Sequence, residues 1–185
     1  MRLIILDRDG VINKDSTEFV KTPEEWIPIK GSLQAIARLS QAGYDVVIIT
    51  NQSGIGRGLI SADMLGQIHV RMIDYIHQAG GKIQSILFCP HLPSDDCDCR
   101  KPKAGLYREL AEQMNISFSG VYSVGDSERD LLAAKEAGAV PILVKTGNGK
   151  KTKQKINTDT SGVLENVLVF DNLSKFVDAL VSNNL

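Results

Sequence analysis

Four clusters of polar residues in this 185-residue sequence have side chains that can do chemistry. They are the acids of Asp7-Arg8-Asp9, the hydroxyl and amide of Thr50-Asn51, the cations of Arg100-Lys101, and a second pair of acids, Asp126 and Asp130. Magnesium prefers oxygen ligands, commonly one or two carboxylates together with waters and a substrate phosphate. The acids therefore suggest a magnesium site. A cation beside that site could hold phosphate oxygens while a carboxylate attacks phosphorus.

Each cluster follows a short apolar run. These runs are mostly β-branched and apolar on both faces, which is typical of parallel strands covered by helices. They predict strands at Leu3–Leu6, Val46–Ile49, Ile86–Phe88, Val121–Val124 and Pro141–Val144, and a weaker one at Val167–Phe170. Ligands bind beyond the carboxyl ends of the strands in an open α/β sheet. We therefore expect the four clusters to converge on one edge of the sheet.

Helical patterns alternate with the predicted strands. Apolar stripes or capping residues predict helices at Leu33–Gly43, Leu65–Ile76, Leu106–Met114, Ser127–Gly138 and Leu173–Val181, the second of them after the capping candidate Ser61. This alternation predicts an α/β fold with a doubly wound, mostly parallel sheet, forming a single domain over residues 1–185.

Two segments interrupt the alternation. Residues 89–103 are rich in Cys, Pro and Asp and are interpreted as an insertion that forms the only cover of the site. Residues 147–162 are polar, with four lysines between positions 150 and 155, and are expected to be a mobile surface loop.

All three cysteines lie in the insertion. Cys89, Cys97 and Cys99, together with His91, offer three sulfurs and one imidazole, which is the composition of a closed tetrahedral zinc site. We predict a structural Zn²⁺ that stiffens the loop and aims the cations that follow it. The alternatives are a disulfide, which the odd count disfavours, and thiols without metal, which a loop rich in Pro and Asp could hardly bury.

Composition limits the partners. The sequence is 43% apolar and 23% charged, and its net charge of -1 gives no electrostatic argument for nucleic acid or an anionic membrane. No stretch reaches the roughly 20 apolar residues that span a bilayer. The apolar run near the N-terminus is too short for the core of a signal peptide. We expect a cytoplasmic monomer that acts on a small molecule.

The motifs resemble those of a known family. Asp7-x-Asp9, Thr50, Lys101 and Gly125-Asp126-x-x-x-Asp130 resemble, in this order and over nearly the whole chain, the four motifs of the haloacid-dehalogenase-like (HAD) phosphatases. Three longer segments resemble its histidinol-phosphatase and heptose-bisphosphatase branch: residues 7–13, 50–58 and 89–102. Two departures are visible, a short loop between His91 and Cys97 and Ala104 where the branch often has proline, and neither touches a catalytic motif.

The resemblance implies a role for each motif. Asp7 would attack phosphorus, and Asp9 would protonate the leaving sugar oxygen and later deprotonate water. Mg²⁺ would bind Asp7, the Asp9 carbonyl and Asp126. The phosphoryl oxygens would bind Thr50, Asn51 and Lys101, while Asp130 would support Lys101 or the metal waters. The candidates for binding the rest of the substrate are Arg57, Arg100, Ser53 and Asn13.

The implied substrate is a phosphorylated sugar, a heptose bisphosphate of lipopolysaccharide core synthesis, with histidinol phosphate as the alternative. Two other classes of function are alternatives to a phosphatase. A receiver-like domain that is phosphorylated on aspartate would lack an acid two residues after the nucleophile, which is Asp9 here. An inactive module whose metal loop binds a protein would not need the intact set of acids. His69 and His77 have no partner in the sequence pattern and are interpreted as ordinary histidines.

Overall fold

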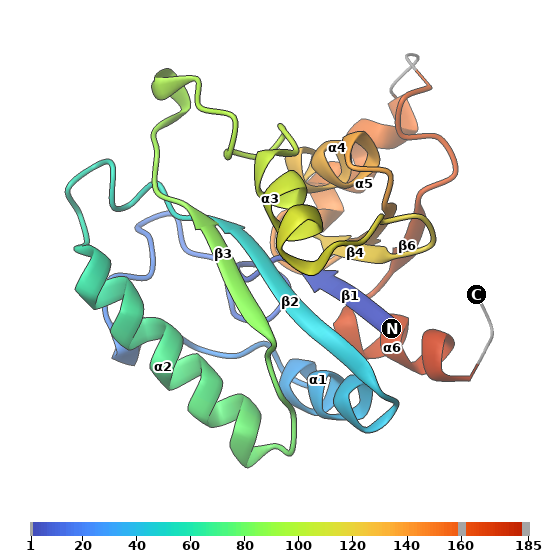
Figure 1. The fold of residues 1–185 in the computed structure, drawn as a ribbon, viewed down its shortest axis with the longest axis horizontal. Coiled ribbons are helices and arrows are strands. Elements are labelled where there is room, and N and C mark those ends of the chain that lie inside the picture. Colours follow the sequence, from blue (N-terminus) through green and yellow to red (C-terminus); the bar gives the residue numbers. More distant parts are fainter. Residues whose placement is uncertain (1, 159–161, 183–185) are drawn as a thin grey trace.

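The computed structural model describes residues 2–158 and 162–182. Within these ranges six parallel strands form one sheet in the order β3-β2-β1-β4-β5-β6 (Figure 1). The strands are β1 (Arg2–Leu6), β2 (Tyr44–Asn51), β3 (Ser85–Cys89), β4 (Tyr122–Gly125), β5 (Val140–Val144) and β6 (Leu168–Phe170). Each predicted strand overlaps an observed one, and the predicted doubly wound α/β fold is confirmed.

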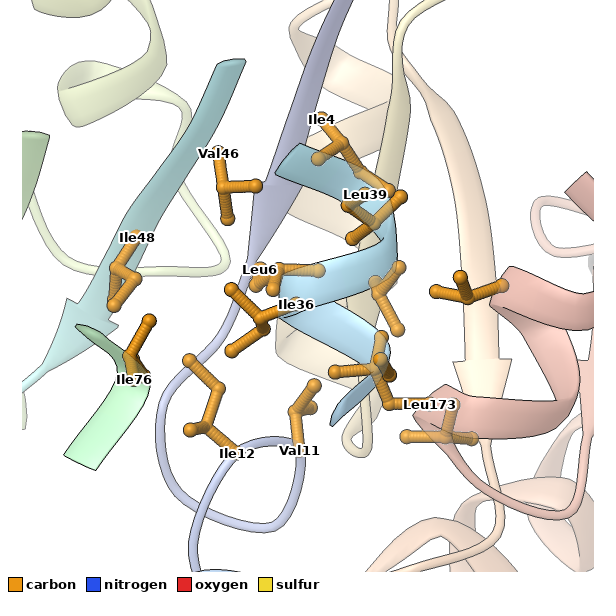
Figure 2. Close-up of a cluster of buried hydrophobic side chains, with 14 of the residues drawn as sticks. Ile4, Leu6, Val11, Ile12, Ile36, Leu39, Val46, Ile48, Ile76 and Leu173 are labelled. Carbon is orange, nitrogen blue, oxygen red and sulfur yellow. The ribbon is translucent and has the colours of Figure 1, made fainter. Parts of the chain in front are cut away.

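Helices cover both faces of the sheet because the strands are apolar on both faces. Ile4 and Leu6 of β1 point to one face, where they pack with the helices α1 (Ser32–Gln41), α2 (Ala62–Gln78) and α6 (Leu173–Val181). Figure 2 shows this cluster around Ile36. Leu3 and Ile5 point to the opposite face, against α3 (Gly105–Met114) and α4 (Glu128–Glu136). None of the helices in the described ranges is long and apolar enough to cross a bilayer.

The lysine-rich segment differs from its prediction. Residues 149–158 form helix α5 (Gly149–Thr158), so the expectation of a mobile loop is wrong for them, while 159–161 lie outside the described residues. The helix has almost no apolar stripe, and its buried residues are Gly149 and Thr152. The Thr152 hydroxyl donates a hydrogen bond of 2.8 Å to the Asp126 carbonyl oxygen. A polar contact of this kind leaves no signal in a hydrophobic pattern.

The insertion after β3 runs beyond the carboxyl end of that strand and returns to α3, at the top of the view in Figure 1. It contains one short 3₁₀ turn, Pro93–Asp95. The last residues of the insertion, just before α3, include Arg100 and Lys101, so the insertion itself carries one of the four polar clusters.

Candidate active site

The four polar clusters meet where β1 lies between β2 and β4. Leu6, the last residue of β1, is level with Val124 near the end of β4 and with Ile48 of β2, which continues to Asn51. This is the point where the strand order reverses, and ligands bind at such points in open α/β sheets. A cavity of about 260 Å³ opens there. The predicted site residues that line it are Asp7, Asp9, Thr50, Asn51, Ser53, Arg100, Lys101 and Asp130.

Lys101 is the cation at the centre of the site. Its side chain is only 2% exposed, and its ammonium lies 2.9 Å from Asp7 Oδ1 and 2.7 Å from Asp130 Oδ1. It also donates to the Ile49 carbonyl oxygen at 2.8 Å. Burial raises the pKa of Asp7 to about 6, with repulsion from Asp130 acting in the same direction and the Lys101 charge opposing both. Asp130 was expected to support either Lys101 or the waters on the metal, and its contact in the structure is with Lys101.

Asp9 is enclosed by donors. The Arg8 guanidinium approaches both of its oxygens at 3.0 Å, Asn13 donates to Oδ1 at 2.8 Å, and Gln52 donates to Oδ2 at 2.8 Å. Burial by itself would raise the pKa of Asp9, but the Arg8 charge and these hydrogen bonds lower it below its ordinary value. The side chain is therefore directed away from the acids of the neighbouring strand, which leaves the Asp9 carbonyl as the group available to a metal.

The residues after β2 hold one another as well as lining the cavity. Thr50 is buried and its hydroxyl accepts a hydrogen bond of 3.0 Å from Gln52. The Asn51 amide donates to the Lys101 carbonyl and accepts from the Lys101 N–H, both at 3.1 Å. Asn51 therefore fixes the backbone of Lys101, and its contact with phosphate stays a prediction.

Asp126 is packed against glycine backbone. A Cβ atom at Gly10 or at Gly147 would lie 2.1 Å from Asp126 Oδ2, and both glycines have positive φ. The same oxygen accepts the Asn148 N–H at 2.7 Å. Only glycine permits this close approach, which directs the carboxylate towards Asp7.

The acids fit a divalent cation. Oxygens of Asp7, Asp126 and Asp130 lie within 4.8 Å of one another. Burial raises the pKa of Asp126 to about 8, assisted by the negative charges of Asp130 and Asp7. A group of buried carboxylates that repel each other lacks positive charge, and Mg²⁺ with its oxygen preference supplies it. Asp7 and Asp126 could each give one ligand, while Asp130 is already paired with Lys101.

The remaining candidates for substrate binding lie at different depths. Asn13 is fully buried behind Asp9 and does not line the cavity. Arg57 does not line it either, because its guanidinium lies over the ring of Phe19, 5.6 Å from the centroid. Phe19 itself lines the cavity, so Arg57 stands at the rim behind it. Arg100 lines the cavity and donates to the His91 carbonyl at 3.2 Å.

The cysteine cluster has the shape of a metal site. The three sulfur–sulfur distances are 3.6 Å (Cys89–Cys97), 3.3 Å (Cys89–Cys99) and 3.4 Å (Cys97–Cys99), and His91 Nδ1 lies 3.2 Å from Cys99 Sγ. The cysteines are free, and a disulfide would need about 2.05 Å. Tetrahedral zinc with bonds of about 2.3 Å places its sulfurs roughly 3.8 Å apart. The expected set of four ligands is thus brought together, at slightly shorter spacing.

Several residues that were not selected from the sequence belong to the site, and three of them are linked to Asp9 by hydrogen bonds, directly or through Arg8. Gln52 bridges Asp9 and Thr50, and its place in the run after β2 was the signal that could have found it. Arg8 is 1% exposed, and in the sequence it lies between the two predicted catalytic acids, Asp7 and Asp9. His69 contacts Arg8 at 3.4 Å. His69 was interpreted as an ordinary surface or core histidine, and it is buried in the structure, but the partner that its helical pattern did not reveal lies 61 residues away in the chain.

Comparisons with known proteins agree with this geometry. A family model described as HAD-hydrolase-like matches residues 98–173. The D-glycero-β-D-manno-heptose-1,7-bisphosphate 7-phosphatase of Pseudomonas putida is 49% identical over 98% of this chain and all of its own. The protein of the same name from Bordetella bronchiseptica is 56% identical over 82% of this chain and 85% of its own.

Solved structures give the same result. The D,D-heptose 1,7-bisphosphate phosphatase of B. bronchiseptica, complexed with magnesium and phosphate, superposes with a TM-score of 0.94 at 49% identity, covering 99% of both chains. The corresponding enzyme of Burkholderia thailandensis gives a TM-score of 0.76 at 39% identity, over 98% of this chain and 99% of its own.

The raised pKa of Asp126 predicts how stability depends on pH. The folded state keeps the Asp126 proton up to about pH 8, whereas the unfolded chain loses it near 3.8, so stability is lost as the pH rises between these values. In magnesium-free buffer, Asp126→Asn should therefore gain stability over wild type from pH 6 to pH 8, by up to about 1.4 kcal/mol per pH unit. Denaturant unfolding at each pH measures the difference.

Magnesium should cancel this advantage at pH 8, because it binds the wild-type carboxylate and not the amide. The exposed Asp74→Asn on α2 serves as the control and should show no change with pH. An Asp126→Asn advantage that is constant from pH 6 to pH 8 would contradict the assignment of Asp126 as a strained, uncompensated carboxylate.

Proposed function

Since this chain belongs to the HAD-like hydrolase family of the D-glycero-β-D-manno-heptose-1,7-bisphosphate 7-phosphatases, we propose that it removes the C7 phosphate of that sugar bisphosphate. The observation that carries the proposal is the buried Lys101–Asp7 pair at 2.9 Å beside Asp126, because it brings a candidate nucleophile, a cation and a candidate metal ligand together. The reaction serves the synthesis of precursors for the lipopolysaccharide core.

Asp7 is the proposed nucleophile. Its carboxylate attacks the C7 phosphorus, the bond from phosphorus to the sugar oxygen breaks, and an aspartyl phosphate forms. Lys101 and the Thr50 hydroxyl hold the phosphoryl oxygens. Lys101 also keeps Asp7 ionised against the effect of burial, so the nucleophile is available at neutral pH. Water then attacks phosphorus, phosphate leaves and Asp7 is regenerated.

Asp9 is the proposed general acid and base. It gives a proton to the sugar oxygen as that oxygen leaves, and it takes a proton from the attacking water in the second step. The donors around it favour the carboxylate, which is the form that the second step requires. The negative charge of a bound phosphate has the opposite effect and favours the protonated form needed first.

Two metals fit the proposal. Mg²⁺ would be held by Asp7, Asp126 and the Asp9 carbonyl, and it would neutralise charge on the phosphoryl oxygens. Zn²⁺ would be held by Cys89, His91, Cys97 and Cys99 in a closed site without an open position for substrate. Its proposed role is structural, since the loop that it closes leads into Lys101.

The remaining features of the proposal concern the setting of the enzyme. Three thiolates that bind metal persist in a reducing compartment, which favours the cytoplasm. The small cavity and the slight net charge of -1 suit a small phosphorylated sugar and not nucleic acid or a membrane. We propose a monomer that acts as one catalytic domain with the insertion at 89–103 as its minimal cap.

The central test measures phosphate release by wild type and by Asp7→Asn. We expect wild type to hydrolyse heptose 1,7-bisphosphate with Mg²⁺ and to stop when Mg²⁺ is removed. Asp7→Asn should be inactive although it folds, because a nearly isosteric amide cannot attack phosphorus. The control is Asp74→Asn, because Asp74 is exposed. Asp130→Asn is unsuitable as a control because Asp130 pairs with Lys101. Normal turnover by Asp7→Asn would refute the mechanism. If wild type prefers histidinol phosphate, that compound replaces the heptose bisphosphate as the proposed substrate.

Zinc should copurify at one equivalent per chain. Three thiolates and an imidazole in a closed site bind it firmly, so it should survive a brief chelation that removes Mg²⁺. Elemental analysis of protein purified in metal-free buffer measures the amount. Cys97→Ser should lose zinc, and His77→Gln, a histidine change outside the cluster, should keep it. A well-folded, active wild type containing less than about a tenth of an equivalent would contradict the prediction.

Recognition of the second phosphate is predicted to involve arginine. Arg100 lines the cavity and Arg57 stands at its rim, and an arginine can grip phosphate with two parallel hydrogen bonds. Each change to alanine should reduce the preference for the bisphosphate over the 7-phosphate, by roughly 10–150-fold for a lost charge-assisted contact worth about 1.5–3 kcal/mol. Hydrolysis of an aryl phosphate should be retained.

The measurement is kcat/KM for the bisphosphate, the monophosphate and the aryl phosphate. Arg108→Ala is the matched control, because Arg108 is exposed on α3 and pairs with Glu136. An equal loss on all three substrates would place the arginine at the reaction centre and not in recognition.

A further inference from the structure

A buried arginine and a buried histidine lie directly behind the proposed acid and base. Arg8 is 1% exposed and belongs to the loop after β1, while His69 is 9% exposed and belongs to α2. Neither takes part in the reaction as proposed above. Burying a guanidinium costs free energy unless hydrogen bonds and opposite charges compensate for the lost water. The burial of Arg8 beside Asp9 therefore suggests that it has a role in the site.

The Arg8 guanidinium contacts Asp9 and Gln52 on one side and His69 on the other. Nη2 and Nε face the two oxygens of Asp9 at 3.0–3.3 Å, and Nη2 also donates to Gln52 Oε1 at 3.1 Å. Nη1 lies 3.4 Å from His69 Nε2 on the other side. A guanidinium has donors only, so the histidine ring must accept this hydrogen bond and be neutral, with its proton on Nδ1. Burial, assisted by the Arg8 charge, lowers the pKa of His69 to about 4, which agrees with a neutral ring.

His69 is itself fixed from the opposite side. Its ring meets the edge of Phe88 on β3 at 6.1 Å between centroids. α2 is packed on the sheet through Ile68 and Met72, which flank His69 and belong to the main core. The chain of contacts therefore runs from the packed helix α2 through His69 and Arg8 to the Asp9 carboxylate.

We propose that His69 and Arg8 are positioning residues for proton transfer by Asp9: His69 fixes the Arg8 guanidinium, whose planar fork holds the Asp9 carboxylate at the leaving oxygen. The inference rests on the proposed function and deepens it. His69 does not line the cavity, and Arg8, which does, acts in this proposal through the Asp9 carboxylate. A carboxylate that could rotate freely would lose much of its effect, because proton transfer needs donor and acceptor within hydrogen-bonding reach.

The dependence of the rate on the leaving group distinguishes positioning from a general structural role. A sugar alkoxide needs its proton as the phosphorus–oxygen bond breaks, whereas 4-nitrophenolate leaves with little help. kcat/KM covers the steps up to this bond cleavage. Loss of positioning should therefore fall on the sugar substrate and spare the aryl phosphate, while a damaged fold or metal site would lower both.

The experiment compares wild type, His69→Leu, His69→Gln and His77→Leu on heptose 1,7-bisphosphate and 4-nitrophenyl phosphate. His69→Leu removes the acceptor at similar volume, and we expect about a tenfold fall in kcat/KM for the sugar, within the ~10²–10⁴-fold that general acid–base catalysis contributes. The aryl phosphate should change less than about twofold, and KM for the sugar should not rise. His69→Gln, which keeps an acceptor, should recover part of the loss. His77→Leu, exposed on the same helix, should equal wild type.

Equal loss on both substrates, or no loss on the sugar, would overturn the proposal. Should His69→Leu not fold, Arg8→Lys gives the same test, because lysine keeps the charge but cannot hold two oxygens and contact His69 at once. Wild-type inactivity on the sugar would count against the proposed function itself. Wild-type activity with an unselective His69→Leu would count against the positioning role alone.

Discussion

Mutual repulsion among buried carboxylates is the constraint on which the site depends. Asp7, Asp126 and Asp130 approach one another within 4.8 Å, largely out of water. Their negative charges must be compensated or the groups would take up protons. The nearby cations are Lys101, which pairs with Asp7 and Asp130, and Arg129, which lines the same cavity. Two positive charges therefore face three carboxylates, and Asp126 has the most strongly raised pKa of the three. The proposed requirement for Mg²⁺ thus follows from an excess of one negative charge that the described side chains leave uncompensated.

Backbone geometry makes this crowding possible. The strands β1 and β4 run side by side with Leu6 level with Val124, and the Asp7 N–H donates to the Val124 carbonyl at 2.9 Å. Asp126 can then lie between glycines that come too close for any side chain. The α5 helix fixes Asp126 from behind through Thr152. This candidate metal ligand is therefore held by contacts that each involve main-chain atoms, which move less than side chains do.

The sheet and most of the candidate site could be predicted from the sequence, and the reason is the same for both. Parallel strands such as Val46–Ile49 are continuous apolar runs, and the polar residues that follow them must meet at one edge. α5 was missed because its fixed residue, Thr152, makes a polar contact inside a lysine-rich run. Arg8 and His69 were missed for a different reason. An arginine beside two acids looks exposed in a sequence, and only the fold shows that a histidine on α2 accepts its third donor group.

The two layers of helices act on different parts of the proposed reaction. Asp130 lies in the first turn of α4, which packs with α3 on one face of the sheet, and it pairs with Lys101 beside the proposed nucleophile. His69 lies on α2 on the opposite face, and it fixes Arg8 behind the acid and base. Asp7 and Asp9 are only two residues apart, yet each is controlled from its own side of the sheet. A doubly wound sheet permits this because both faces carry helices. Nucleophile and proton donor can therefore be tuned by separate contacts, and a change on one face need not disturb the group held from the other.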